Sequence, residues 1–110
     1  MIVFADDPDV RVVEAPSAGA HPKLSIEIKG GVDASNVYNR LGEAEKSHLK
    51  ARRAGSQEFW TLVRAHYDPA KATVASPTTT HFFRINRILD ISDPEHAEFR
   101  QLLSIAIGIR

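Results

Sequence analysis

The alternation of apolar and polar positions is clearest between residues 24 and 29. Apolar side chains at positions 24, 26 and 28 alternate with polar side chains at 25, 27 and 29, until Gly30-Gly31 ends the pattern. This period of two is typical of a β-strand whose two faces have different surroundings. It predicts a half-buried strand, with Leu24, Ile26 and Ile28 in the core and Ser25, Glu27 and Lys29 facing outward.

Two shorter β-prone runs precede this strand. Ile2 to Phe4 is followed by Asp6-Asp7-Pro8-Asp9, a composition that favours a turn. Residues 10 to 15 then predict a second strand, and the stretch from Pro16 to Pro22 predicts a hairpin loop. The first 29 residues therefore predict three successive strands.

A long helix is predicted from about residue 35 to residue 54. Apolar or small residues, with one histidine, recur at helical spacing: Val37, Leu41, Ala44, His48 and Ala51. Asp33 or Ser35 can cap the first turn, and Gly55 is a stop signal. His48 falls on the apolar stripe, which indicates a packing role, and the five histidines show no spacing that favours a zinc site.

The remaining chain predicts a strand, a segment with no clear period and a closing helix. Residues 58 to 63 predict a strand with Phe59 and Trp60 in the core, whereas strand and helix both remain open after His66. From Pro94 to Ile107 a helix is predicted, with Asp93 as cap and an apolar stripe. That stripe consists of Phe99, Leu102, Leu103 and Ala106. The expected fold class is α/β (α+β), a central mixed β-sheet flanked by helices.

Length and composition fit one ordinary globular domain covering residues 1–110. The chain is 43% hydrophobic and 25% charged and has no cysteine, which excludes disulfides and thiolate metal sites. Its longest apolar run is far below the roughly 18 residues typical of a membrane span, and the first residues show no targeting pattern. A cytoplasmic location without a membrane partner is the default expectation.

The charge balance is zero, with 14 basic and 14 acidic residues. A protein that coats DNA is usually clearly basic, so the net charge argues mildly against nucleic-acid binding. The distribution is uneven, however, because acids predominate before residue 34 and bases predominate from 34 to 64. A metal-dependent nuclease needs both, since carboxylates hold the cation while bases meet phosphate.

Three residues form a candidate catalytic cluster. Glu27 and Lys29 point the same way on an extended strand, so that a metal at Glu27 and the Lys29 ammonium would lie beside one phosphate. Asp9 begins the preceding strand of the hairpin, where it could lie across from Glu27. Asp6 and Asp7 compete with Asp9 for the metal role, and Asp9 is preferred because it directly precedes the strand.

A simpler interpretation is a solvated strand face. One acid-x-Lys triplet is expected by chance about 0.6 times in a chain of this composition, and charges on an outer strand face usually have no further role. The context favours the cluster. The triplet lies on the most regular strand, the single Pro-Asp pair stands at a strand start, and two glycines follow.

These residues carry a family resemblance. Pro8-Asp9 followed by Glu27-Ile28-Lys29 resembles the PD-(D/E)xK motif, and residues 26 to 63 resemble the XcyI family of type II restriction endonucleases. The resemblance implies a Mg²⁺-dependent endonuclease that acts on double-stranded DNA at a short palindrome of the CCCGGG kind. It also implies that Asp9, Glu27 and the Ile28 carbonyl bind the metal, and that Lys29 orients or activates water and stabilises the transition state.

Members of this family are much longer, so the chain is expected to be a C-terminal part that contains the catalytic core and lacks an upstream region. A homodimer is expected, because a two-fold DNA site is matched by a two-fold protein. Two other hypotheses remain: a non-catalytic remnant of such a nuclease, and a nuclease-like structural domain that serves a partner protein.

Candidate DNA contacts lie on the long helix. Asn36 and Arg40 follow the glycine pair closely enough to approach a phosphate, and Lys46 belongs to a polar side of the helix. The other members of that side are Asn39, Glu43, Lys50 and Arg53. A solvated helix face is the alternative for all of them. Ser76 and Thr78 to Thr80 could touch phosphate or bases, or simply form turns and caps.

Overall fold

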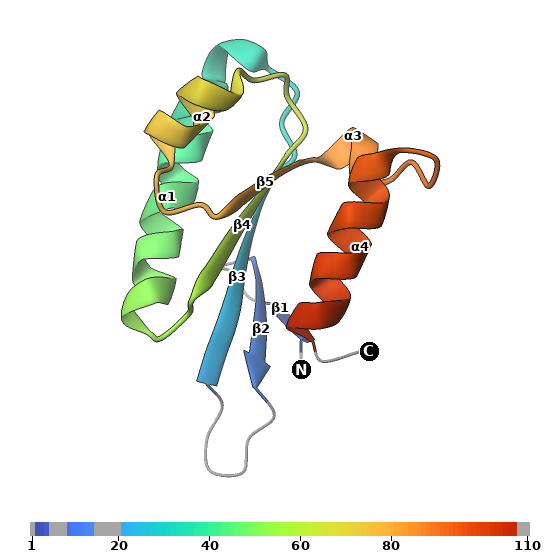
Figure 1. Cartoon of the computed structure of the whole chain (residues 1–110). Helices are drawn as coiled ribbons and strands as arrows, with labels where there is room; N and C mark the ends of the chain where they lie inside the picture. The colour runs from blue at the N-terminus through green and yellow to red at the C-terminus, as the bar shows by residue number, and fades with distance from the viewer. Residues whose placement is uncertain (1, 5–8, 15–20, 108–110) are drawn as a thin grey trace.

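The computed structural model describes residues 2–4, 9–14 and 21–107, and these form a five-stranded mixed sheet. Its strands follow the chain in order: β1 (Ile2–Phe4), β2 (Val10–Glu14), β3 (His21–Lys29), β4 (Glu58–Val63) and β5 (His81–Arg84). β1, β2 and β3 pair antiparallel, whereas β3, β4 and β5 pair parallel. The arrow of β2 accordingly points against that of β3 in Figure 1.

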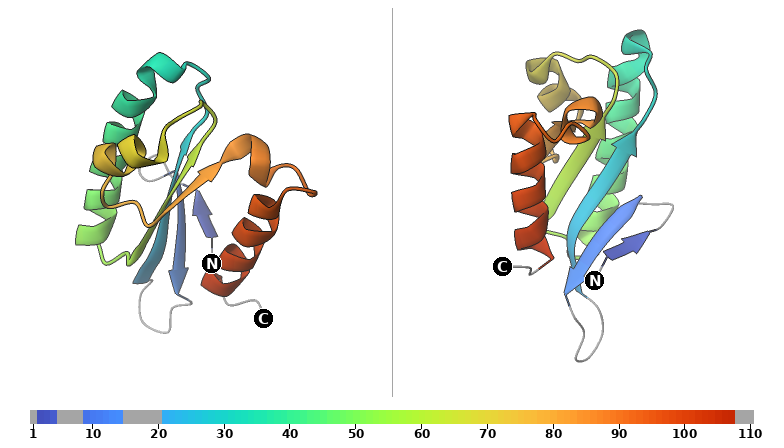
Figure 2. Two further views of the ribbon diagram at one scale, coloured as in Figure 1. Left: turned by 45° about the horizontal axis from the view of Figure 1, so that its top comes forward. Right: turned by 90° about the vertical axis from the view of Figure 1, so that its right-hand side faces the viewer.

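Helices cover both faces of the sheet. A 3₁₀ turn (Ala34–Asn36) leads into α1 (Val37–Arg53), and α2 (Pro69–Ala75), α3 (Ile85–Ile88) and α4 (Pro94–Ala106) follow. α1 and α2 lie on one side of the parallel strands and α4 lies on the other, as Figures 1 and 2 both show. The expected central mixed sheet flanked by helices is confirmed.

The helix boundaries follow from local chemistry. The Asp33 carboxylate accepts a hydrogen bond from the Ser35 backbone N–H, and the Asp93 carboxylate accepts one from Glu95 N–H, which satisfies donors at each helix start. Gly55 ends α1 with a φ of 111°, a conformation that side chains disfavour. The helix start that was expected near residue 35 is a 3₁₀ turn, and α1 proper begins at Val37.

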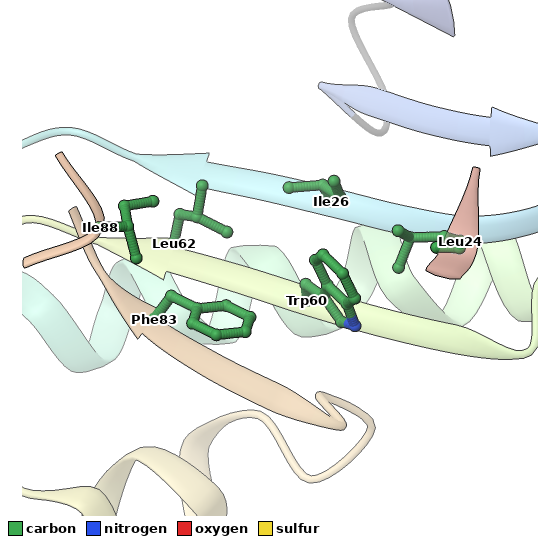
Figure 3. Packing of buried hydrophobic residues seen from close by; sticks show 7 residues of the cluster. Leu24, Ile26, Trp60, Leu62, Phe83 and Ile88 are labelled. Atoms are coloured by element: carbon green, nitrogen blue, oxygen red, sulfur yellow. The ribbon is translucent and has the colours of Figure 1, made fainter. Parts of the chain in front are cut away.

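One hydrophobic cluster fills the space between the sheet and α4. Leu24, Ile26, Trp60, Leu62 and Phe83 converge there (Figure 3). The predicted stripe of α4 packs against them through Phe99, Leu102, Leu103 and Ala106. Trp60 meets Phe83 and Phe99 edge to face at centroid distances of 5.4 and 5.7 Å, which is a favourable aromatic geometry.

A second cluster fills the opposite side, under α1 and α2. It contains Val37, Leu41, Val63, Tyr67 and Ala72. Because both faces of the parallel strands are covered, the prediction that β3 is half-buried is wrong: Ser25 and Glu27 are 0% and 3% exposed. Ile28, which was expected in the core, is 43% exposed, because it lies beyond the last β2–β3 pair, Val10 with Ile26, at the rim of the sheet.

The segment without a clear period contains the short elements α2, β5 and α3. β5 has four residues and α3 has four, too few for either a period of two or a helical period to stand out. No helix in the described part of the chain combines the length and the apolar composition needed for a membrane crossing.

Candidate active site at the carboxyl end of β3

The sheet brings Asp9 and Glu27 together from positions 18 residues apart. Val10, the first residue of β2, pairs with Ile26 of β3, and one step further along this antiparallel pair Asp9 lies across from Glu27. The placement of Asp9 opposite Glu27 that the hairpin suggested is therefore observed. Asp6 and Asp7, which competed for the same role, lie outside the described residues.

Two backbone donors fix the two carboxylates. The Asp9 N–H donates to Glu27 Oε2 at 2.9 Å, and the Ile28 N–H donates to Asp9 Oδ2 at 2.7 Å. A backbone N–H of β3 thus binds the Asp9 carboxylate, and the backbone N–H of Asp9, next to β2, binds the Glu27 carboxylate of β3. These two hydrogen bonds orient both carboxylates, and Ser47 gives Glu27 a further hydrogen bond.

The electrostatics of this pair favour a cation. Burial raises the pKa of Glu27, and the negative charge of Asp9 raises it further, whereas hydrogen bonds from Ser47 and from the Asp9 backbone lower it. Two facing carboxylates repel each other when both are ionised. A divalent cation between them would offset that repulsion and favour the ionised form of Glu27.

Lys29 completes the cluster two residues along the same strand. It shares the α1-facing side of β3 with Glu27, and its ammonium lies 3.8 Å from a carboxylate oxygen of Glu43 on α1. The Lys29 side chain is 18% exposed and that of Glu43 is 67% exposed, so the pair lies at the surface and adds little stability. Glu43, a member of the polar helix side that was considered for DNA contacts, thus pairs with Lys29.

A metal at this site depends on a small donor set. Across the described residues, no group of three or more histidine, aspartate or glutamate side chains converges as a metal site. Two carboxylates and a backbone carbonyl are hard oxygen donors of the kind that Mg²⁺ accepts, with water filling its other positions. The Asp9 and Glu27 carboxylates and the Ile28 carbonyl are therefore donors of the kind that would suit a magnesium ion.

The three predicted DNA contacts have different surroundings. Arg40 packs its guanidinium against Gly31, where an added Cβ would lie 3.0 Å from Cζ, and its buried Nε has no hydrogen-bond partner among the described residues. Asn36 ends the 3₁₀ turn and accepts a hydrogen bond from Asn39. Lys46 is exposed near the middle of α1. Asn36 and Arg40 thus lie near the end of β3, and Lys46 lies further along the helix.

A buried polar network joins α1, β3 and β4 next to the candidate site. His48 is fully buried, and its ring nitrogens hydrogen-bond to Ser25 Oγ at 3.1 Å and to Thr61 Oγ1 at 2.8 Å. The expected packing role of His48 is confirmed. Burial and the nearby Lys29 charge lower the pKa of His48 to about 4, against an opposing effect of Glu45, so the ring is neutral at pH 7.

The same network explains the hydroxyl-rich segment after α2. Thr78 donates through its backbone N–H and its hydroxyl to the two carboxylate oxygens of Glu45, at 2.8 and 2.6 Å. Ser76 donates to Glu45 as well, and Thr79 links Ser76 to Thr61. These residues tie the α2–β5 connection to α1 and β4, a tertiary role that goes beyond the turns and caps expected for them. Their link to Glu45 had no signal in the sequence, because it spans more than 30 residues.

The mixed sheet between helices, with paired acids where β2 begins and β3 ends, is consistent with a restriction-endonuclease-like core. The family model described as XcyI restriction endonuclease matches residues 1–110, and the chain belongs to this family. The resemblance seen in the sequence is thereby confirmed.

Two curated relatives are similar to most of the chain. It is 40% identical over 104 residues to the type II restriction enzyme XcyI of Xanthomonas campestris pv. cyanopsidis, and 41% identical over 103 residues to the type II restriction enzyme Cfr9I of Citrobacter freundii. Each match covers 92% of this chain and 31% of the relative, so the chain spans about a third of their length. No solved structure matches it.

Proposed function

We propose that this chain is the catalytic core of a type II restriction endonuclease that hydrolyses phosphodiester bonds of double-stranded DNA with Mg²⁺. The observation that carries the proposal is the reciprocal hydrogen bonding of Asp9 and Glu27, which holds two carboxylates together on neighbouring strands, with Lys29 two residues beyond Glu27 on the same face of β3. Membership of the XcyI family supports the same activity.

Asp9 and Glu27 would hold the metal, each through its carboxylate. When bound, a divalent cation supplies Lewis-acid stabilisation of the negative charge that develops on the phosphate. Lys29 contributes a second positive charge from the same strand face, where it stabilises the phosphorane-like transition state and orients the attacking water. Glu43 restrains the Lys29 ammonium from α1.

The Ile28 carbonyl is a suitable third ligand. In a regular strand the N–H and C=O of one residue point to the same edge, and the Ile28 N–H donates to Asp9. The carbonyl of Ile28 then faces the Asp9 side, beyond the last β2–β3 pair. This agrees with the opposite direction of the next carbonyl, because Lys29 O accepts from Arg64 N–H on the β4 side.

The DNA contacts proposed from the helix are Asn36, Arg40 and Lys46. Arg40 has the strongest support, because its buried Nε lacks a partner among the described residues and a phosphate oxygen would satisfy it. A palindrome of the CCCGGG kind is proposed as the target, with a homodimer placing one core on each strand.

Supercoiled-plasmid cleavage tests the proposal. Wild type is expected to cut a plasmid with a CCCGGG site in Mg²⁺ and to cut neither in EDTA nor on a plasmid without the site. Glu27→Gln and Lys29→Ala are each expected to lower the rate roughly 100-fold or more, since each removes a charge that acts in the transition state. Glu98→Gln is the matched control, because Glu98 is exposed on α4, and it should cut like wild type.

A non-catalytic remnant is the second candidate, because the matched region is 31% of each relative and the activity in their names is that of the whole relative. It predicts a chain that unfolds cooperatively in circular dichroism and yet leaves plasmid intact at every Mg²⁺ concentration. That combination would refute the catalytic proposal for these 110 residues.

A further inference from the structure

A cavity of about 310 Å³ opens where β4 and β5 end. Its lining comes from the residues that leave β4, the last residue of β5 and the short helix α3. These residues are Arg64, Ala65, His66, Arg84, Asn86 and Arg87. We refer to this cavity as the arginine pocket.

The pocket is strongly cationic. Three of its six lining residues are arginines, and no aspartate or glutamate lines it. Among the described residues, no carboxylate forms an ion pair with these three guanidinium groups. The nearby Glu95 carboxylate accepts a hydrogen bond from the backbone N–H of Arg84 at 2.9 Å, so this carboxylate faces the main chain.

The three arginines differ in how they are held. The Arg84 guanidinium lies over the Tyr67 ring, 5.7 Å from its centroid, and Arg84 is half-buried. Arg64 and Arg87 are exposed. One cation is thus fixed in advance at the wall of the pocket, and two reach solvent where an approaching anion would meet them.

The arginine pocket shares an edge of the sheet with the candidate active site. Lys29 pairs with Val63, and Val63 pairs with Arg84, so Arg84 lies two strands from Lys29, on the order of 10 Å away. The Arg64 N–H donates to Lys29 O at 3.0 Å, which joins the two sites directly. A nucleic-acid strand rises about 3.4 Å per nucleotide, so a few nucleotides cover this distance.

We propose that the arginine pocket binds a backbone phosphate of the DNA strand, a few nucleotides from the bond that Asp9, Glu27 and Lys29 address. Arginine suits this role because its planar guanidinium donates two parallel hydrogen bonds to phosphate oxygens. The inference rests on the proposed nuclease function for its substrate. It adds a contact on β4, β5 and α3 that the helix contacts Asn36, Arg40 and Lys46 do not provide.

Equilibrium binding in EDTA tests this contact separately from cleavage. A labelled duplex containing CCCGGG is titrated with wild type and with the Arg64→Ala/Arg87→Ala double variant at several salt concentrations. The double variant is expected to bind more weakly, and the slope of log K against log salt should become less negative by about one for each arginine removed.

Arg52→Ala with Arg100→Ala is the matched control, since it removes the same charge at two exposed positions, on α1 and α4, that do not line the pocket. It should retain the wild-type slope, and circular dichroism should show that all variants are folded. An equal loss in the control would make the effect one of overall charge and overturn the pocket, as would a double variant that binds like wild type. Failure of wild type to bind the duplex also overturns it.

Cleavage distinguishes failure of the pocket from failure of the nuclease proposal. Pocket-dependent binding without Mg²⁺-dependent cutting would keep the phosphate contact and refute the catalytic function. Cutting by wild type, together with unchanged affinity in the double variant, would keep the catalytic function and refute the phosphate contact. Inorganic phosphate is a further probe: if it alone shifts the His66 NMR signals as strongly as duplex does, the pocket is a small-anion site and the DNA contact is refuted.

Discussion

At the scale of single residues, burial in β3 departs from the simple alternation of its sequence. Glu27 is buried and Ile28 is 43% exposed, the reverse of their hydrophobicity. Burying a carboxylate is costly unless it accepts hydrogen bonds, and Glu27 accepts them from the Asp9 N–H and from Ser47. A bound cation would offset the remaining cost of burying the Glu27 charge beside Asp9. The Asp9–Glu27 pair is therefore the strongest indication of function at this scale.

His48 gives a pH-dependent stability that can be measured. Its pKa falls from 6.5 to about 4 in the folded chain, which corresponds to about 3 kcal/mol of folding free energy. The unfolded chain takes up the proton below pH 6.5 and the folded chain resists it until about pH 4. Stability contributed by neutral His48 is therefore present above pH 6.5 and is lost as the pH falls toward 4.

Urea unfolding at pH 7 and pH 4.5 measures this effect. The wild-type free energy of unfolding should fall by more than that of His48→Gln, which keeps hydrogen-bonding capacity and does not titrate. Carboxyl groups titrate in both proteins and cancel in the comparison. An equal fall in the two proteins would contradict the assigned role of His48.

At the scale of elements, α1 connects the site to the rest of the fold. It runs antiparallel to β3, so that Glu43, Ser47 and His48 meet Lys29, Glu27 and Ser25 in reverse order along the strand. One helix therefore supports the candidate lysine, the buried acid and the network beneath them. A shift of α1 along its axis would disturb all three.

Two glycines of this helix test its geometry in opposite directions. Gly42 lies inside α1 with nothing within 4 Å of an added Cβ, so Gly42→Ala should raise the free energy of unfolding by about 0.5–1 kcal/mol. Gly55 ends the helix at φ 111°, so Gly55→Ala should lower it by about 1 kcal/mol or more.

The two variants make the same chemical change and serve as controls for each other. The thermal midpoint, followed by far-UV circular dichroism, should lie above the wild-type value in Gly42→Ala and below it in Gly55→Ala. Shifts of the same sign would show that the geometry described at one of the two positions does not hold.

At the scale of the whole molecule, the parallel strands are shared by two hydrophobic clusters. Leu62 belongs to the cluster under α4, and its neighbour Val63 belongs to the one under α1. Because successive residues of one strand serve opposite clusters, neither side can open while leaving the other intact. A single cooperative unfolding transition follows.

Phe83 tests this coupling. It is 1% exposed between Trp60 and Phe99, so Phe83→Ala should cost about 3–5 kcal/mol, and the milder Phe83→Leu about 1 kcal/mol. The single tryptophan reports the α4 side by fluorescence, and circular dichroism reports the helices on both sides. The two signals should give one midpoint in each variant.

Val74→Ala is the matched control, because Val74 is 82% exposed on α2 and its loss should change stability by less than about 0.5 kcal/mol. Separate midpoints for fluorescence and circular dichroism in Phe83→Leu would argue that the two clusters unfold independently.

Much of the fold could be predicted from the sequence. The first three strands, the long helix, the strand at Glu58–Val63 and the closing helix each carry a period or an end signal of their own. α2, β5 and α3 could not be assigned, since a few residues show no period and tertiary contacts decide their conformation. The arginine pocket was missed for a related reason: its residues lie on two short elements and a loop.

The sequence by itself determined the local elements and the candidate acids and lysine, because periodicity, capping residues and a short motif are properties of neighbouring positions. Only the tertiary structure decided that β3 is covered on both faces, that Asp9 and Glu27 exchange hydrogen bonds with the opposite strand, and that His48 bridges Ser25 and Thr61. These facts depend on strand register and on which helix covers which face. Both are set by packing between segments far apart in the chain, for which no local pattern exists.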